Sequence, residues 1–178
     1  LAEPIVDEPE VKAPIASIDV DDNPDVYCAQ IDTGAFVTCT DQKHLLYVYS
    51  TYDESHPSPV WLLPVTDGSD VVPEGHGYLH VPAGNSQGFL AVHCYYHPSL
   101  CTMVIDEHDL ACAAGHKDSN ITSENLVKFH NAGTFTYHAK HKLWSAYDVV
   151  IHGILHHGKC YTNALIPFYD SKDYDSLL

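Results

Sequence analysis

The residues Asp32-Thr33-Gly34 have the types and order needed to present one carboxylate for acid-base chemistry. They follow the apolar-alternating run 26–31, which predicts a strand that ends at Asp32. Glycine at the third position permits a turn or a close backbone approach that a side chain would block. The Thr33 hydroxyl can then hydrogen-bond to a neighbour while Asp32 points into a cleft. An ordinary Asx-type turn is the alternative, because Asp, Thr and Gly are common turn residues.

A second chemical alternative is a zinc site in the histidine-rich part of the chain. Its ligand-type residues are His138, His141, His152, His156, His157 and Cys160. The pair His152 and His156 has helical i, i+4 spacing, which suits metal binding on a helix. However, Gly153, Gly158 and the apolar run 149–151 favour a strand and a turn, which would place the histidines on different faces or loops. We therefore expect no metal, and a His/Cys zinc-binding domain is the weaker alternative.

A third alternative is a cysteine nucleophile, with Cys94 activated by His93 or His97. Adjacent residues of a strand point to opposite faces of the sheet, so His93 is badly placed to activate Cys94. A small buried thiol in a β core is the simpler interpretation.

Composition excludes several classes of partner. The chain has 178 residues, with 24 acidic and 8 basic residues and a formal net charge of -16 when histidine is neutral. Such a surface repels phosphate backbones and anionic membranes. No apolar run approaches the roughly 20 residues of a membrane-spanning helix. The six cysteines form no C-x-x-C pair, and no signal-peptide pattern is present. We therefore predict an intracellular, cytoplasmic protein that binds neither nucleic acid nor membrane directly.

The distribution of Tyr, Pro and Gly, with few stretches at helical spacing, predicts an all-β fold with one or two short helices. The predicted strands include 26–31, 59–65, 75–82, 88–97, 126–130, 133–138, 147–155 and 159–165. A short helix is expected at 41–46. A second helix is expected at 106–114, with Asp106 as its N-cap and Gly115 at its end.

Together with Asp32-Thr33-Gly34, several short sequence motifs follow one another in an order that indicates a protein family. They are Ile31-Asp32-Thr33-Gly34-Ala35, Thr38-Cys39-Thr40 leading to Leu45-Leu46, Asp67-Gly68-Ser69, Gly75-His76-Gly77-Tyr78-Leu79-His80-Val81-Pro82 and Tyr95-Tyr96-His97-Pro98-Ser99-Leu100. In this order they resemble the retropepsin-like protease domain of Copia-type retrotransposon polyproteins. Gly133-Thr134-Phe135-Thr136 and Gly158-Lys159-Cys160-Tyr161 resemble the hairpins that lead from that domain towards the integrase. The resemblance spans roughly residues 25 to 165.

This resemblance implies a retropepsin-like acid-protease barrel, a closed or nearly closed β sheet, and aspartic endopeptidase activity that matures a polyprotein. By position, Asp32 would be the catalytic carboxylate, Thr33 the bracing hydroxyl and Gly34 the turn glycine. The hairpin around Asp67-Gly68-Ser69 would lie in the flap that closes over the substrate. One departure is Asp106, which follows Val104-Ile105 where retroviral relatives carry glycine.

The domain organisation follows the same resemblance. Residues 1–24 are predicted to be an acidic disordered leader, because they mix Pro, Asp and Glu with little periodicity. Residues 25–116 would be the protease core. Residues 117–165 would be a C-terminal β-hairpin extension towards the integrase region, and 166–178 a polar tail.

The partners expected are a second copy of the chain and a polyprotein peptide, because Asp-Thr-Gly occurs once and a paired site needs two carboxylates. No cofactor is expected, and the setting would be an element-encoded particle inside the cell. A non-catalytic remnant, or a co-opted retropepsin-like interaction module, is the alternative from a different functional class.

Overall fold

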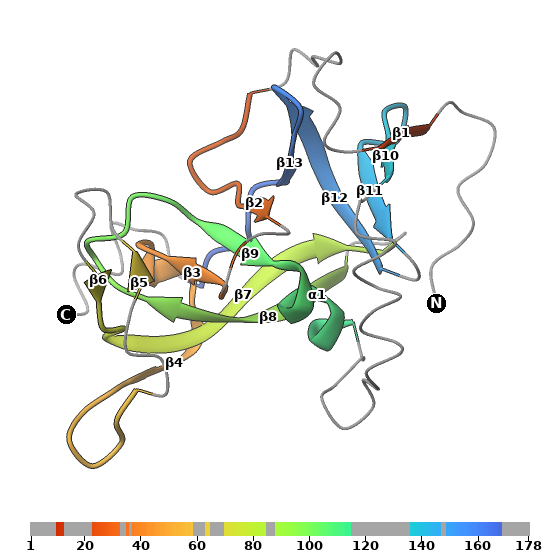
Figure 1. The fold of residues 1–178 in the computed structure, drawn as a ribbon. Helices are drawn as coiled ribbons and strands as arrows, with labels where there is room; N and C mark the ends of the chain where they lie inside the picture. The colour runs from red at the N-terminus through yellow and green to blue at the C-terminus, as the bar shows by residue number, and fades with distance from the viewer. Residues whose placement is uncertain are drawn as a thin grey trace.

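The computed structural model describes residues 10–12, 23–32, 35, 37–58, 63–64, 70–84, 88–114, 136–146 and 149–168. In these ranges strands predominate, together with one α-helix and one 3-10 helix (Figure 1). The prediction of a mainly β chain is confirmed. No helix in this described part of the chain is long and apolar enough to cross a membrane.

The elements are short apart from one long hairpin and one long C-terminal strand. The strands are β1 (Glu10–Lys12), β2 (Gln30–Asp32), β3 (Cys39–Thr40), β4 (Tyr47–Thr51), β5 (Leu63–Pro64), β6 (Asp70–Val71), β7 (Gly75–Ala83), β8 (Gly88–Tyr96), β9 (Val104–Asp106), β10 (Thr136–His138), β11 (Leu143–Ala146), β12 (Val149–His156) and β13 (Lys159–Thr162). The 3-10 helix η1 covers Lys43–Leu45, and the α-helix α1 covers Glu107–Ala113.

Most of these strands belong to one mixed 11-stranded sheet in the order β1-β10-β11-β12-β13-β2-β9-β3-β8-β7-β4. The neighbours β2 and β9 are parallel, as are β3 and β8. An additional antiparallel contact between Ile151 of β12 and Ala83 of β7 joins two distant parts of the sheet. Strands β5 and β6 form a separate two-stranded sheet. The sheet therefore connects segments from nearly the whole described chain.

The hairpin of β7 and β8 crosses the molecule in Figure 1 and supplies much of the core. Along β7 the side chains alternate between buried and more accessible positions. Leu79, Val81, Val92 and Cys94 are fully buried in the main hydrophobic cluster. This period of two is the pattern expected of a sheet with one face against a core, and the predicted strands 75–82 and 88–97 match β7 and β8 closely.

The strand β2 has neighbours on both sides, β9 on one and β13 on the other. The Thr162 N–H donates to the Ala29 carbonyl at 2.9 Å, and the Ala29 N–H donates to Thr162 Oγ1 at 3.0 Å. Segments predicted as core (25–116) and as extension (117–165) therefore contribute strands to the same sheet. Within the range predicted as leader, β1 pairs with β10.

The start of β2 is later than the sequence predicted. The Tyr27 N–H donates to Asp25 Oδ1 at 3.0 Å, and the Cys28 N–H donates to the Asp25 carbonyl at 2.9 Å. These local bonds make a turn where the alternating pattern predicted a strand.

The predicted helix at 106–114 is present as α1, with Asp106 at the N-cap position. The Asp106 side chain makes no capping hydrogen bond, although its extended backbone is that of an N-cap. Gly115 lies outside the described residues. The helix at 41–46 is limited to the single 3-10 turn η1.

One residue of β4 adopts a backbone conformation that its side chain disfavours. Val48 has φ +53° and is 77% exposed, at a register irregularity between Tyr47 and Ser50. A β-branched residue in the left-handed region costs about 1–2 kcal/mol.

We expect Val48→Asn to raise the free energy of unfolding by about 1 kcal/mol, measured by urea denaturation. The exposed Val26, whose φ is not positive, is the control: Val26→Asn should leave stability unchanged, and an equal gain there would contradict the explanation.

Candidate active site

Asp32 lies at the end of β2, half-buried, beside the point where β9 leads into α1. The parallel register of the two strands places Asp32 opposite Asp106. The Ala35 N–H donates to the Asp32 carbonyl at 3.1 Å, so the chain returns close to the end of β2. Thr33 and Gly34, the other predicted catalytic positions, lie outside the described residues. The structure thus places the carboxylate at a strand end, as the sequence predicted.

Thr38 connects three elements next to this strand end. Its Oγ1 donates to Asp109 Oδ2 at 2.7 Å and accepts from the Asp106 N–H at 3.0 Å. The Thr38 N–H also donates to Asp109 Oδ2, at 3.2 Å. Thr38 is fully buried, so water does not compete for these bonds. The segment before β3, the end of β9 and α1 are therefore fixed relative to one another, and β9 in turn positions β2.

These hydrogen bonds hold the partly buried Asp109 side chain of α1 against Thr38. Its Oδ2 accepts one hydrogen bond from the Thr38 hydroxyl and one from the Thr38 backbone N–H. Sequence analysis did not identify Thr38 or Asp109 as part of this site, because the two residues are 71 positions apart. The hydroxyl in Thr38-Cys39-Thr40 was the available signal, but its partner could not be chosen from the sequence.

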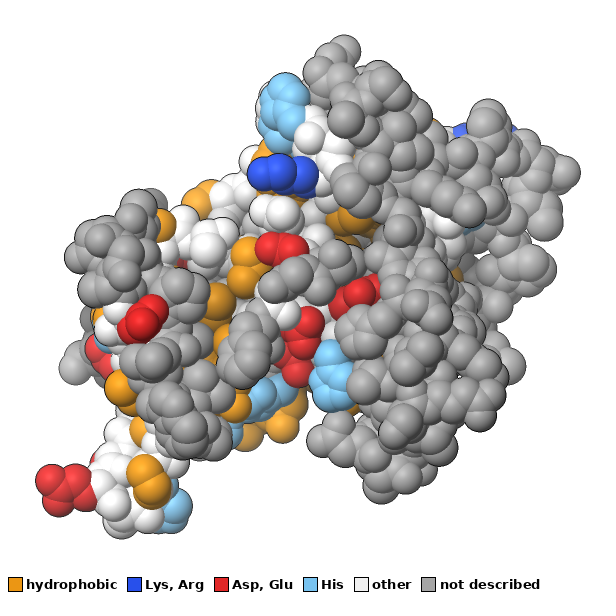
Figure 2. Space-filling view, viewed as in Figure 1, with side chains coloured by type: hydrophobic (Ala, Val, Ile, Leu, Met, Phe, Trp, Pro, Cys, Tyr) orange, Lys and Arg blue, Asp and Glu red, His pale blue; other side chains and the backbone are white. Residues whose placement is uncertain are grey.

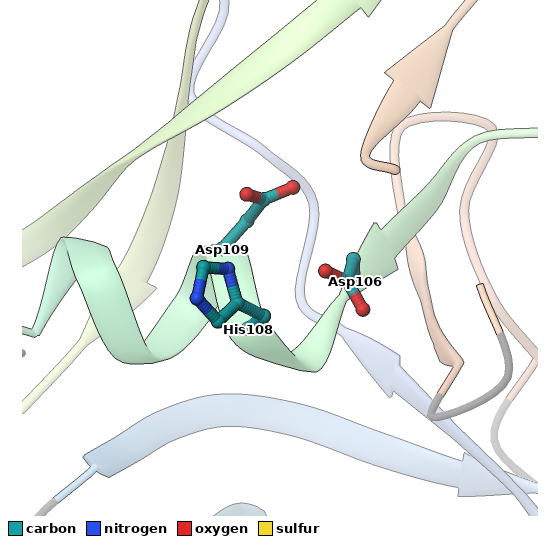
Figure 3. A group of neighbouring side chains, drawn as sticks. All are labelled: Asp106, His108 and Asp109. Atoms are coloured by element: carbon teal, nitrogen blue, oxygen red, sulfur yellow. The ribbon is translucent and has the colours of Figure 1, made fainter. Parts of the chain in front are cut away.

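Acidic and histidine side chains gather near the middle of the face shown in Figure 2. Among the described residues, Asp106, His108 and Asp109 each offer one ligand atom, and these atoms lie within 4.8 Å of one another (Figure 3). All three side chains are only partly buried, and Asp109 already accepts hydrogen bonds from Thr38. Asp109 therefore serves to hold the fold, and we assign no cation to this group.

The predicted flap residues Asp67, Gly68 and Ser69 lie outside the described residues. The strands on either side of them pair antiparallel, Leu63 with Val71 and Pro64 with Asp70. This short hairpin is separate from the main sheet.

Three of the cysteines described here, Cys39, Cys94 and Cys160, are poor nucleophiles, whereas Cys112 Sγ lies 3.9 Å from both ring nitrogens of His108. Burial raises the pKa of the Cys94 thiol well above its usual value, and His93 and Cys94 alternate between the accessible and buried faces of β8. Burial also raises the pKa of Cys39 to about 11, with a smaller effect from Asp41. For Cys160, burial and then the Glu107 charge raise the pKa to about 12. Since the thiolate is the nucleophile, these groups are inert at neutral pH.

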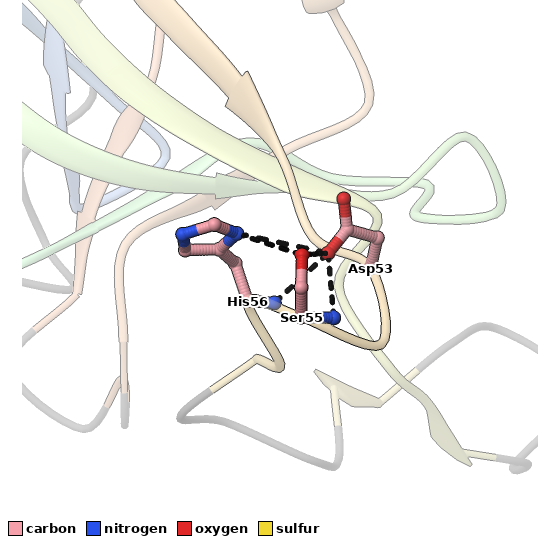
Figure 4. Close-up of polar contacts among 3 residues, drawn as sticks. All are labelled: Asp53, Ser55 and His56. Atoms are coloured by element: carbon pink, nitrogen blue, oxygen red, sulfur yellow. Dashed lines mark hydrogen bonds and ion pairs between the residues drawn. The ribbon is translucent and has the colours of Figure 1, made fainter.

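Asp53, Ser55 and His56 form a Ser-His-Asp group that does not have the geometry of a catalytic triad (Figure 4). Asp53 Oδ1 accepts from the Ser55 N–H, the Ser55 hydroxyl and the His56 N–H at 2.9, 2.7 and 2.8 Å. The hydroxyl, followed by the backbone groups, lowers the pKa of Asp53. Ser55 Oγ meets His56 Nδ1, the same ring nitrogen that faces Asp53, so no relay through the ring exists. The group is an exposed Asx turn.

Four of the six residues of the zinc alternative are spread along the β12–β13 hairpin, while His138 lies on β10 and His141 in the turn after it. His152 and His156 lie on β12, His157 lies in the following turn, and Cys160 lies on β13. Contrary to the expectation of different faces, His152 and His156 share one face of β12, because residues four apart in a strand point the same way. At about 3.3 Å per residue they stand roughly 13 Å apart. His152 Nε2 bonds to the Gly84 carbonyl at 2.7 Å. The structure brings no zinc-type ligand set together here.

Comparison of the chain with protein-family models, with curated proteins and with solved structures found no match. The assignment of a function therefore depends on the site itself.

Proposed function

We propose that this chain is one subunit of an aspartic-type endopeptidase of the retropepsin-like class, acting in the polyprotein of a Copia-type retrotransposon. The observation that carries the proposal is the position of Asp32, half-buried at the end of β2 and beside the β9–α1 junction. Support comes from the hydrogen bonds that join Thr38 to Asp106 and Asp109, which we call the brace. These bonds fix β9 and α1 beside the end of β2. The proposal extends to the finer fold class, a retropepsin-like barrel.

The proposed chemistry requires a pair of carboxylates. Two carboxyl groups held about 3 Å apart share one proton and titrate as a coupled pair. The ionised member acts as a general base on a bound water, and the protonated member polarises the carbonyl of the scissile bond. Water is the nucleophile, so no covalent acyl-enzyme forms. The chain provides a single Asp-Thr-Gly, and we infer that a second copy supplies the other carboxylate across a two-fold axis.

The proposed substrate is a peptide segment bound in an extended conformation. Strand-like hydrogen bonds would hold its backbone, and pockets would receive alternate side chains. The hairpin of β5 and β6, which is separate from the main sheet, is the element we propose as the flap.

The test is cleavage of the polyprotein by wild type and by Asp32→Asn. We expect the variant to lose at least about a thousandfold in rate, because asparagine cannot act as the general base and removes the shared proton. The matched control is Asp25→Asn, which changes an exposed aspartate in the segment just before β2. Equal cleavage by wild type and Asp32→Asn would overturn the proposal. A folded wild type with no activity on any polyprotein segment would favour the non-catalytic interaction module.

The source of the second carboxylate is tested by mixing subunits. With a threefold excess of Asp32→Asn over wild type, random pairing leaves about one sixteenth of dimers with two intact aspartates. The rate should fall to about that fraction of an all-wild-type sample at equal total protein. If Asp106 instead pairs with Asp32 within one chain, as their register would allow, the rate should fall only to about one quarter.

A further inference from the structure

Two histidines meet on the neighbouring strands β7 and β8. His76 of β7 and His93 of β8 are diagonal neighbours, because His76 is opposite Tyr95 and Tyr78 is opposite His93. His76 Nδ1 lies 2.9 Å from His93 Nε2. Both side chains are partly buried. The two ring nitrogens are therefore within hydrogen-bonding distance, with the N–H of one ring donating to the nitrogen of the other.

Three tyrosines hold the imidazole rings in place. Tyr52 stacks on His76, with ring centroids 4.9 Å apart and an interplanar angle of 10°. Tyr78 and Tyr95 present edge-on contacts to His93, at 5.6 and 4.9 Å between centroids. Rings fixed by packing lose little conformational entropy when they bind a ligand, so the pair is preorganised.

The separation of the nitrogens is close to that of two ligands on one metal ion. With metal–nitrogen bonds of 2.0–2.1 Å, a tetrahedral ion requires about 3.3 Å between the two nitrogens, and a right-angled pair requires about 2.9 Å. The observed separation of 2.9 Å differs from these two values by no more than about 0.5 Å.

We propose that His76 Nδ1 and His93 Nε2 form a two-histidine site for a divalent transition-metal ion of the Zn²⁺ or Cu²⁺ type. Imidazole nitrogen suits these ions, whereas Mg²⁺ and Ca²⁺ prefer oxygen ligands. Binding needs a lone pair on both facing nitrogens, so the ring that now donates the hydrogen bond must move its proton to its other nitrogen. Water completes the coordination. The ion would crosslink β7 and β8.

Burial, and then the neighbouring His76, lower the pKa of His93, whereas Asp109 acts in the opposite direction. Asp109 on α1 lies close enough to His93 to act on it electrostatically. The groups that act on His93 include no lysine or arginine. The net charge of -16 further favours cations near the surface. The proposed metal site does not use Asp32, and the Asp109 carboxylate that acts on His93 is the one that accepts the hydrogen bonds from Thr38.

The test is calorimetric titration of the full chain with Zn²⁺, and separately with Cu²⁺ and Mg²⁺. Wild type should bind one Zn²⁺ and bind Cu²⁺ more tightly, in the Irving–Williams order, with no measurable Mg²⁺ binding. His76→Ala and His93→Ala should each weaken this site at least about tenfold. His157→Ala, which removes an exposed histidine of a hairpin turn, is the matched control and should leave the site intact.

A second measurement on wild type keeps the test decisive if the alanine variants fail to fold. Zinc should shift the ¹⁵N resonances of His76 Nδ1 and His93 Nε2 together, at one equivalent of metal. Unshifted resonances, or zinc binding that survives both substitutions, would overturn the proposal and leave the pair as a hydrogen bond only.

Discussion

Gly153→Ala is expected to lower the free energy of unfolding by about 3 kcal/mol or more. A Cβ atom at this position would clash with the Tyr161 carbonyl oxygen and lie 2.7 Å from Trp144 Cδ1. Trp144 is fully buried, and its Nε1–H donates to the carbonyls of Ile154 and Tyr161 at 3.0 and 3.2 Å. The indole can reach both strands only because position 153 has no side chain. Adding a methyl group must push the indole away or separate β12 from β13.

Urea denaturation followed by tryptophan fluorescence measures this effect. The matched control is Gly84→Ala, where a Cβ would meet nothing within 4 Å but φ is +80°. That change should cost only about 1–2 kcal/mol, for the conformational strain alone. Equal losses at the two glycines would show that packing around Trp144 does not require Gly153.

Thr38→Val is expected to cost about 2–4 kcal/mol of stability, because it removes a buried hydroxyl without changing the side-chain shape. The variant leaves the Asp106 N–H without its acceptor at 3.0 Å and deprives Asp109 of its shortest hydrogen bond. If Asp32 is catalytic, the loosened β9 should also reduce the peptidase rate under conditions where the variant is folded. Denaturation curves and cleavage rates on the same samples separate the two effects.

Thr38→Ser is the control for this prediction. Serine keeps the hydroxyl and loses one methyl group, so about 1 kcal/mol is expected and the cleavage rate should stay near that of wild type. A loss equal to that of valine would mean that the methyl packing, and not the hydroxyl, holds the junction.

Locally encoded elements could be predicted from the sequence. The alternation of residues 75–82 and 88–97 specified β7 and β8, and the sequence around Asp106 specified the start of α1. In both cases the information lies within a few residues, in the period of the apolar positions or in the acidic residues at the start of the helix.

The arrangement around Asp32 could not be predicted in the same way. Strand β9 lies between β2 and β3, although it follows them by more than 60 residues along the chain. Such short strands have almost no periodicity, and their pairing is decided by tertiary contacts. The His76–His93 contact joins two strands that were predicted, but it depends on their register, which was not.

The pairing of β13 with β2 has a consequence for the size of the cooperative folding unit. A chain that ended at residue 116 would lack Thr162 and would leave the edge of β2 without its partner. It would also lose the hydrogen bond that the Leu165 N–H donates to the Tyr27 carbonyl. An unprotected edge invites pairing with other chains. Strand β13 therefore covers the edge of the strand that carries Asp32, and the two strands are expected to unfold together.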